Sequence, residues 1–332
     1  MAKVLPHSGI ANNTGQRIDK QSVTPKNGNN SLLSLDTIAQ PVHAKGREDL
    51  LKRAKNRYFS TELARALSVV DSPLNKAYRR TIFDCTALLI QEGYSIKSKY
   101  CNARWCNTCN RIRTAKLLEG YRKPLEAFSD LQFVTLTAPY VTREDLKEAI
   151  KTRIKTVQLI IRARRRTTAI NGIRKLECTY NAEADRYHPH FHFFIEGKEN
   201  AEWVVSQWLQ RNPTAEHWCQ DIRPAKDLIE LFKYTTKIVS KTDKGFQVYV
   251  QPLDNIFQSM YGLRTFQPFG NVRMVSEDIE NIKSETYDIP WYESLVWIWE
   301  GNDWHSMITG EVLSGYEPSK RMIELTTDKF II

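Results

Sequence analysis

The chain has 332 residues, of which 41% are hydrophobic, so it can bury the core of one large domain or of two smaller ones. Its 48 lysines and arginines outnumber its 38 aspartates and glutamates, and the formal net charge of +10 favours a polyanionic partner. The sequence has no apolar run of membrane-spanning length and no apolar signal region near its first residue. We therefore expect a cytoplasmic protein without a membrane partner.

The first 128 residues are expected to form two parts of different character. Residues 1–48 are rich in Asn, Ser, Gly, Gln and Lys and lack hydrophobic periodicity, which is typical of a flexible tail. Residues 49–128 begin with leucines and alanines at helical spacing, continue with a group of cysteines and end with a helical pattern over 111–128. We expect 49–128 to form a helical region built around those cysteines.

Four cysteines in this region have the spacing of a metal site. Cys101, Cys106 and Cys109 form a close trio, and Cys85 lies sixteen residues upstream. Four thiolates suit a tetrahedral zinc ion, and a cytoplasmic compartment disfavours disulfides. The pattern predicts a structural Zn²⁺ held by the four cysteines, and the alternative is a set of unrelated buried thiols.

Residues 129–275 alternate between strand and helix patterns and are expected to form the core. Thr142-Arg-Glu-Asp145 resembles a capping box with Asp in the acidic position, which predicts the start of a long helix. Strands are expected over 132–138, 174–181, 188–196 and 246–250, and helices over 142–166, 200–210 and 226–240. Because the two middle strands can pair as a hairpin, this order predicts an α+β fold with helices packed on an antiparallel sheet.

Residues 276–332 form an acidic extension that is rich in tryptophan. Its tryptophans are Trp291, Trp297, Trp299 and Trp304. We expect these rings to pack against the core, because large aromatic side chains are usually buried, and an exposed stacking surface is the alternative.

Two histidines lie on one face of the strand expected over 188–196. Side chains alternate along a strand, so His190 and His192 point to the same side while bulky apolar residues occupy the other. Two imidazoles on one face can bind the same metal ion. Histidines on strands are also common as hydrogen-bonded core or surface groups, so the pair alone does not establish a site.

A tyrosine flanked by an acid and a base follows about forty residues later. On the helix expected over 226–240, Glu230, Tyr234 and Lys237 fall on one face at positions i, i+4 and i+7. A metal site together with such a tyrosine favours covalent phosphodiester chemistry.

Three segments in this order resemble the three motifs of the HUH endonucleases: Thr135-Leu-Thr-Ala-Pro139, His188-Pro-His-Phe-His192 and Glu230-x-x-x-Tyr234-x-x-Lys237. More narrowly, they resemble the single-tyrosine replication initiators of rolling-circle plasmids. The resemblance covers about residues 80–275, and it implies an RRM-like antiparallel sheet flanked by helices, with a four-cysteine zinc knuckle before or inside it. Two departures are the bulky Phe232, where a small residue is expected, and the missing proline after Cys106.

The resemblance implies a metal-dependent, site-specific DNA endonuclease and strand transferase. Tyr234 would attack one strand at a plasmid double-strand origin, giving a 5′-phosphotyrosine link and a free 3′-hydroxyl primer. The family places a carboxylate on the strand beside the histidines, so Glu177 is the expected third ligand of Mn²⁺ or Mg²⁺, with His188 as the alternative. Glu230 would activate water to end the round, and Lys237 would stabilise negative charge.

The expected partners are DNA with a single-stranded or cruciform nick site, and a bacterial host's helicase and polymerase. Two basic clusters are candidates for phosphate contact, although each can also be a solvated helix face. The candidate DNA contacts are Arg111, Arg113, Lys116, Arg162, Arg164, Arg165 and Arg166.

Three other functions fit parts of the pattern. An HUH transposase with two tyrosines is disfavoured by Glu230, and a relaxase is disfavoured because the tyrosine follows the histidines. A non-catalytic, zinc-dependent DNA-binding regulator would not need Tyr234 at all.

Overall fold

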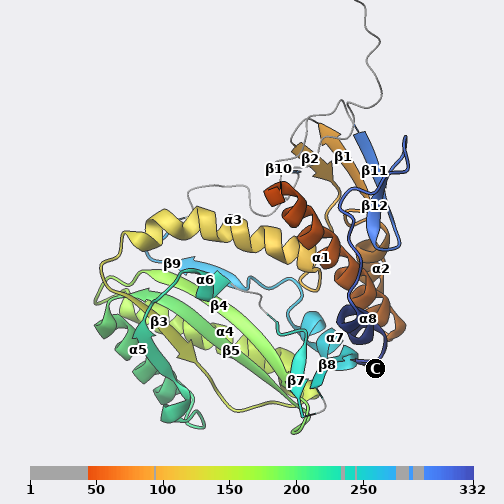
Figure 1. Ribbon diagram of the computed structural model, residues 1–332. Coiled ribbons are helices and arrows are strands. Elements are labelled where there is room, and N and C mark those ends of the chain that lie inside the picture. The colour runs from red at the N-terminus through yellow and green to blue at the C-terminus, as the bar shows by residue number, and fades with distance from the viewer. Residues whose placement is uncertain (1–43, 93–94, 233–235, 244, 274–283, 287–294) are drawn as a thin grey trace, which may run out of the picture. The chain divides into compact units, whose positions relative to one another are not determined.

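A five-stranded antiparallel sheet forms the centre of the computed structural model, which describes residues 44–332 except for 93–94, 233–235, 244, 274–283 and 287–294 (Figure 1). The strand order is β6–β3–β5–β4–β9. The strands are β3 (Leu131–Leu136), β4 (Gly172–Asn181), β5 (Arg186–Glu196), β6 (Asp221–Pro224) and β9 (Phe266–Phe269). The predicted hairpin is confirmed, since β4 and β5 pair along their whole lengths with Glu177 opposite His190.

The alternation of side chains along β5 separates its two faces. Phe191, Phe193 and Ile195 are fully buried in the core cluster beneath α4 (Arg143–Arg164) and α5 (Lys198–Arg211). The predicted start of α4 is confirmed with Thr142 as its N-cap, because the Thr142 side chain accepts a hydrogen bond from the Asp145 amide. The Asp145 carboxylate accepts from the Thr142 hydroxyl, which replaces the backbone bond of a full capping box. The histidines therefore face the opposite side of the sheet.

The histidine side of the sheet is partly covered by α3 (Asn107–Glu126) and by the single helical turn α6 (Ile229–Phe232) (Figure 1). Phe232 is fully buried, and its ring stacks between Tyr121 of α3 and Phe266 of β9 at centroid distances of 6.0 and 5.8 Å. The bulky residue that departs from the HUH pattern therefore anchors α6 to its neighbours.

The prediction of a helix over 226–240 is wrong in length. The described helix covers only Ile229–Phe232, and Thr236, within the expected helix, forms a parallel bridge with Cys178 of β4 instead. Buried contacts on either side override the helical spacing of this segment. Tyr234 lies in the segment 233–235, outside the described residues.

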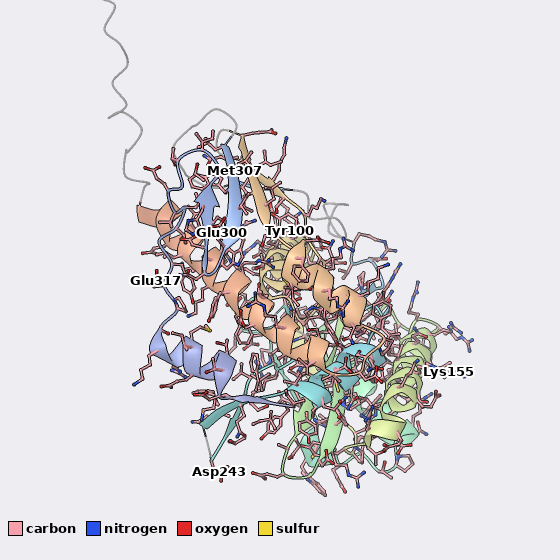
Figure 2. All side chains as sticks on the ribbon, turned by 90° about the vertical axis from the view of Figure 1, so that its right-hand side faces the viewer. Tyr100, Lys155, Asp243, Glu300, Met307 and Glu317 are labelled. Carbon is pink, nitrogen blue, oxygen red and sulfur yellow. The ribbon has the colours of Figure 1, made fainter. Side chains whose placement is uncertain are left out.

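A second five-stranded sheet joins segments that are far apart in the sequence. Its order is β10–β2–β1–β11–β12, and β1 pairs with β11. These strands are β1 (Leu88–Glu92), β2 (Ser95–Ser98), β10 (Ser284–Thr286), β11 (Leu295–Glu300) and β12 (Asp303–Ser306). Trp297 and Trp304 are buried between this sheet and α1 (Ala44–Val69), which confirms the expected burial of these two rings, and Figure 2 shows this sheet beside α1. Trp291 lies outside the described residues.

Except for the short 3-10 helix η2 (His217–Cys219) before β6, the remaining elements surround α1 and the end of the central sheet. They are α2 (Asn75–Phe83), α7 (Val250–Ser259), α8 (Lys320–Thr327), and the small sheet of β7 (Ser240–Thr242), β8 (Gly245–Tyr249) and β13 (Phe330–Ile331). Across the described ranges, each helix is too short or too polar to span a lipid bilayer.

Candidate active site and metal centres

Glu177, His190 and His192 form a cluster that could hold a metal ion on the open part of the histidine face. One ligand atom from each residue lies within 4.8 Å of the others, and His192 Nε2 is 3.6 Å from Glu177 Oε2. The group arises from strand register, because Glu177 lies opposite His190 on the neighbouring strand. His188 is not part of this group, and its ring contacts the rings of Tyr140 and His190 at centroid distances of 4.6 and 5.0 Å.

Hydrogen bonds orient both imidazoles for coordination through Nε2. His190 Nδ1 lies 2.9 Å from the carbonyl oxygen of His188, which can only accept, so Nδ1 carries the proton. His192 Nδ1 lies 3.0 Å from Thr135 Oγ1, within the first of the three motifs. Partners of this kind fix the tautomer and ring orientation of histidines that bind metals.

The electrostatics of the cluster match the protonation states that a divalent cation needs. Burial lowers the pKa of His190, and it lowers the pKa of His192 to about 4, so both imidazoles are neutral near pH 7. Burial by itself would raise the pKa of Glu177, but the charge of Lys175 and the nearby histidines outweigh it and lower that pKa. Two neutral imidazoles and a carboxylate form a suitable donor set for a divalent metal.

Lys175 and Arg153 support the cluster and were not anticipated from the sequence. The Lys175 ammonium is buried and lies 2.9 Å from Glu177 Oε2. Arg153 of α4 is also buried and donates to the carbonyl oxygens of Pro189 and Pro139 at 2.6 and 2.7 Å. It therefore ties the helix to the strand ends that carry the first two motifs.

Glu230 is connected to His192 by a chain of contacts that begins with Arg223 of β6. Arg223 Nη1 lies 3.0 Å from Glu230 Oε2, and its guanidinium lies 4.5 Å from the centroid of the Phe133 ring. That ring stacks on His192 at a centroid distance of 5.3 Å. Lys237 is exposed and directly follows the bridge at Thr236. It lies outside helix α6, so the helical face that the sequence predicts it to share with Glu230 is not formed.

The four predicted zinc ligands come together in a second cluster. Cys85, Cys106 and Cys109 are fully buried, and the Sγ atoms of Cys85 lie 3.7 and 3.6 Å from those of Cys106 and Cys109. Cys101 Sγ lies 3.7 Å from Cys109 Sγ. Zn–S bonds of about 2.3 Å in a tetrahedron place sulfur atoms about 3.8 Å apart, so this cluster could hold a zinc ion.

Without a cation the four thiols would compete for protons. Hydrogen bonds with Cys101 and the other thiols, together with burial, raise the pKa of Cys85. A divalent cation removes this penalty by stabilising the thiolates.

The predicted DNA contacts have different surroundings. Arg113 bonds to Asn110 Oδ1 and to the Asn102 carbonyl, which holds the loop of the cysteine cluster. Arg111 is exposed and lies 3.6 Å from Asp49. Lys116 is half-buried and has a partner of its own.

The arginines at the end of α4 differ in their exposure: one is buried and the others lie at the surface. Arg164 departs from the expectation, because it is buried, bonds to Asn200 and Glu199 of α5, and is not free to meet a phosphate. Arg166 is exposed. Arg162 and Arg165 line a cavity of about 470 Å³ with Arg174 and Arg273.

Arg174 in this cavity was missed because nothing in the sequence marks its position on β4, where it pairs with Phe193 of β5 and Gln267 of β9. Its side chain is buried, Nη1 has no hydrogen-bond partner among the described residues, and burial lowers its pKa to about 10.

Comparison with known proteins gives a family match over the part of the chain that includes the first two motifs. Residues 94–201 match the model of the Rep_1 family, described as replication protein. A "Protein rep" of Staphylococcus aureus is 31% identical over 215 residues, which cover 56% of this chain and 90% of that protein. A "Protein rep" of Streptococcus pneumoniae serotype 2 is 25% identical over 277 residues, which cover 73% of this chain and 85% of that protein.

A third relative, a "Protein rep" of Bacillus amyloliquefaciens, is 28% identical over 150 residues, which cover 41% of this chain and 44% of that protein. No solved structure matches the chain. The match to the staphylococcal protein extends over nearly the whole of that relative, and the chain belongs to the Rep_1 family of replication proteins.

Proposed function

We propose that this replication protein initiates rolling-circle replication of a plasmid by nicking one strand of the double-strand origin. The observation that carries this proposal is the cluster of Glu177, His190 and His192 on one face of the sheet in a replication protein. A hard divalent cation held there, Mn²⁺ or Mg²⁺, would polarise the scissile phosphate as a Lewis acid. Glu177 is the proposed third ligand, because His188 is outside the cluster.

Tyr234 is the proposed nucleophile. Its neighbours in the sequence support this role: Phe232 is packed over the histidine face, and Thr236 is bridged to Cys178, the residue after Glu177. The phenolic oxygen would lose its proton and attack phosphorus, which joins Tyr234 to the 5′-phosphate end of one strand, while the bond to the 3′ oxygen breaks and that oxygen takes up a proton to become the 3′-hydroxyl of the other strand. The 3′-hydroxyl would prime the host polymerase after a host helicase has opened the duplex.

Glu230 is proposed to end the round by accepting a proton from the water that attacks a phosphodiester. Its carboxylate is held by Arg223, and a fixed carboxylate can act as a general base. Lys237 remains a candidate for stabilising negative charge on the phosphate, because its exposed side chain follows Thr236 directly.

The remaining predicted sites have supporting roles in this proposal. A structural zinc ion at Cys85, Cys101, Cys106 and Cys109 would fix the turn before α3 and the loop after β2. The exposed arginines are proposed to contact duplex phosphates, and they are Arg111, Arg162, Arg165 and Arg166.

The test is incubation of the full-length protein with single-stranded oligonucleotides from the origin region and Mn²⁺. We expect a protein–DNA adduct that survives denaturant and that does not form in EDTA. A protein that binds the origin but yields no adduct with any such oligonucleotide would instead be a non-catalytic DNA-binding regulator.

A further inference from the structure

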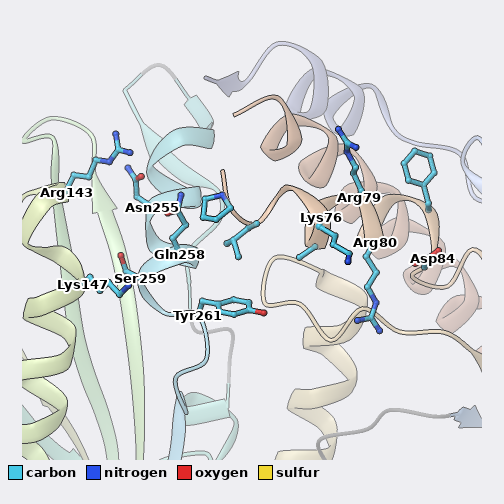
Figure 3. Close-up of a pocket in the computed structure, with 14 residues that line it drawn as sticks. Lys76, Arg79, Arg80, Asp84, Arg143, Lys147, Asn255, Gln258, Ser259 and Tyr261 are labelled. Atoms are coloured by element: carbon cyan, nitrogen blue, oxygen red, sulfur yellow. The ribbon is translucent and has the colours of Figure 1, made fainter. Parts of the chain in front are cut away.

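A strongly basic cavity of about 910 Å³ lies between α2, α4 and α7, away from the basic residues discussed above (Figure 3). Lys76, Arg79 and Arg80 line it from α2, and Arg143 and Lys147 line it from α4. Asp84 is the one acidic residue of the lining that the structure describes. Five cations facing one acid attract a polyanion.

Aromatic side chains add a second kind of surface to this cavity. The side chains of Phe83 and Tyr261 both line it, and they are 70% and 69% exposed. Figure 3 shows Tyr261 between the cations of α2 and those of α4. Exposed rings beside cations are suited to stacking unpaired bases while the cations meet the phosphates. Base pairs in a duplex keep their faces stacked on each other, so duplex DNA cannot use these rings.

The walls of the cavity are held together by a buried carboxylate. Asp254 of α7 is fully buried and accepts hydrogen bonds from Ser72 at 2.6 Å, Tyr78 at 2.5 Å and Gln258 at 2.6 Å. Ser72 and Tyr78 belong to the turn before α2 and to α2 itself, so α2 and α7 form a fixed frame. A preformed cavity lowers the entropic cost of binding.

The cavity extends toward both candidate metal centres. Asn255 lines it and donates a hydrogen bond of 2.7 Å to the hydroxyl of Tyr187, which precedes His188 on β5. At the other end, Arg80 and Tyr261 also line a second cavity of about 360 Å³, whose other lining residues include Cys101 and Arg104. The two cavities are therefore neighbours that share Arg80 and Tyr261, and they lie between the start of the histidine strand and the loop of the cysteine cluster.

We propose that this cavity binds a segment of single-stranded DNA. Its phosphates lie against the cations of α2 and α4, and its bases stack on Phe83 and Tyr261. This second DNA site depends on the proposed function in one respect, which is that the ligand is DNA. It would hold the unpaired strand that leaves the end of the sheet where β5 begins.

The experiment measures binding of a fluorescent single-stranded oligonucleotide, and of the same sequence as a duplex, by anisotropy over a series of salt concentrations. Mn²⁺ and Mg²⁺ are left out throughout and no chelator is added, so metal-dependent cleavage does not interfere and a zinc ion at the cysteine cluster is kept. One variant combines Arg143→Gln and Lys147→Gln. Its matched control combines Lys151→Gln and Lys155→Gln, which removes the same charge from exposed positions of α4 outside the cavity, and Figure 2 shows Lys155 pointing outward.

We expect the cavity variant to lower affinity for the single strand about tenfold and to reduce the slope of log K against log salt by roughly 1.4, about 0.7 for each lost phosphate contact. The control variant should keep the wild-type slope. Tyr261→Ala should also lower affinity for the single strand about tenfold, whereas Tyr261→Phe should keep it, because stacking needs the ring and not the hydroxyl.

The proposal is overturned if the cavity variant behaves like its control, or if Tyr261→Ala binds the single strand as wild type does. It is also overturned if duplex binding falls as much as single-strand binding. Adduct formation is measured separately. If the cavity variant weakens single-strand binding but wild-type protein forms no adduct, the nicking activity is refuted and the cavity proposal is supported. If wild-type protein forms an adduct but the cavity variant binds the single strand normally, the cavity proposal is refuted and the nicking activity is supported.

Discussion

The guanidinium of Arg223 lies 3.0 Å from the carboxylate of Glu230. The two residues come from different elements, β6 and α6, and both side chains are only partly exposed. Arg223 is therefore a positioning residue for the carboxylate that is proposed to end each round of replication.

Replacing Arg223 should affect termination more than nicking. We expect Arg223→Gln to form the phosphotyrosine adduct at a near wild-type rate and to give DNA longer than unit length, as Glu230→Ala should. Arg223→Lys should restore part of the termination, because it keeps a cation near the carboxylate. Product-length gels from replicating cells provide the readout. If Glu230 is only a helix-surface residue, Glu230→Ala will give unit-length products and change stability by only a few tenths of a kcal/mol.

Removal of the paired histidines should abolish metal-dependent nicking. We expect His190→Ala combined with His192→Ala to eliminate Mn²⁺ binding in calorimetry and adduct formation, while binding to duplex origin DNA is largely kept. His188→Ala is the matched control, because this residue lies on the same strand face but outside the cluster. If His188→Ala loses Mn²⁺ binding while Glu177→Gln keeps it, the third ligand is His188 and not Glu177.

Zinc at the cysteine cluster should be separate from the catalytic cation. Purified protein is expected to hold one tightly bound zinc ion by elemental analysis. Cys106→Ser should lower both the zinc content and the melting temperature, because a structural metal contributes directly to folding. Cys219→Ser, which changes an exposed cysteine, should alter neither. Active protein without zinc would contradict this assignment.

The metal-free protein should lose stability in mild acid. Burial lowers the pKa of His188 and of His192 to about 4, whereas histidine in an unfolded chain titrates near 6.5. Between these values the unfolded chain binds more protons, so the stabilising contribution is complete above about pH 6.5 and is lost as pH falls toward 4. The urea midpoint of EDTA-treated protein should therefore be lower at about pH 5 than at about pH 7. His192→Gln should weaken this dependence, and His217→Gln, at an exposed position, should not.

Local patterns predict the elements whose partners are close in sequence. The β4–β5 hairpin and the capped start of α4 follow from alternation and capping, which are properties of short segments. The four cysteines could be grouped because metal ligands have characteristic residue types and spacing.

Long-range contacts explain what the sequence analysis did not anticipate. The helix expected over 226–240 stops because Phe232 is buried against α3 and β9 and Thr236 pairs with β4. Lys175 and Arg223 carry no distinctive motif, and only the register of the sheet brings Lys175 beside Glu177. Arg164 has the same basic sequence context as Arg165, yet packing against α5 buries it.

Formation of a covalent adduct by Tyr234 tests the central claim most directly. Wild-type protein, Tyr234→Phe and a control Tyr261→Phe are incubated with labelled single-stranded origin DNA and Mn²⁺, and the products are separated under denaturing conditions. We predict an adduct for wild type and for Tyr261→Phe, and none for Tyr234→Phe, because only the phenolic oxygen can form the phosphodiester link to the enzyme. An adduct from Tyr234→Phe, or none from wild-type protein that binds the same DNA, would contradict the account.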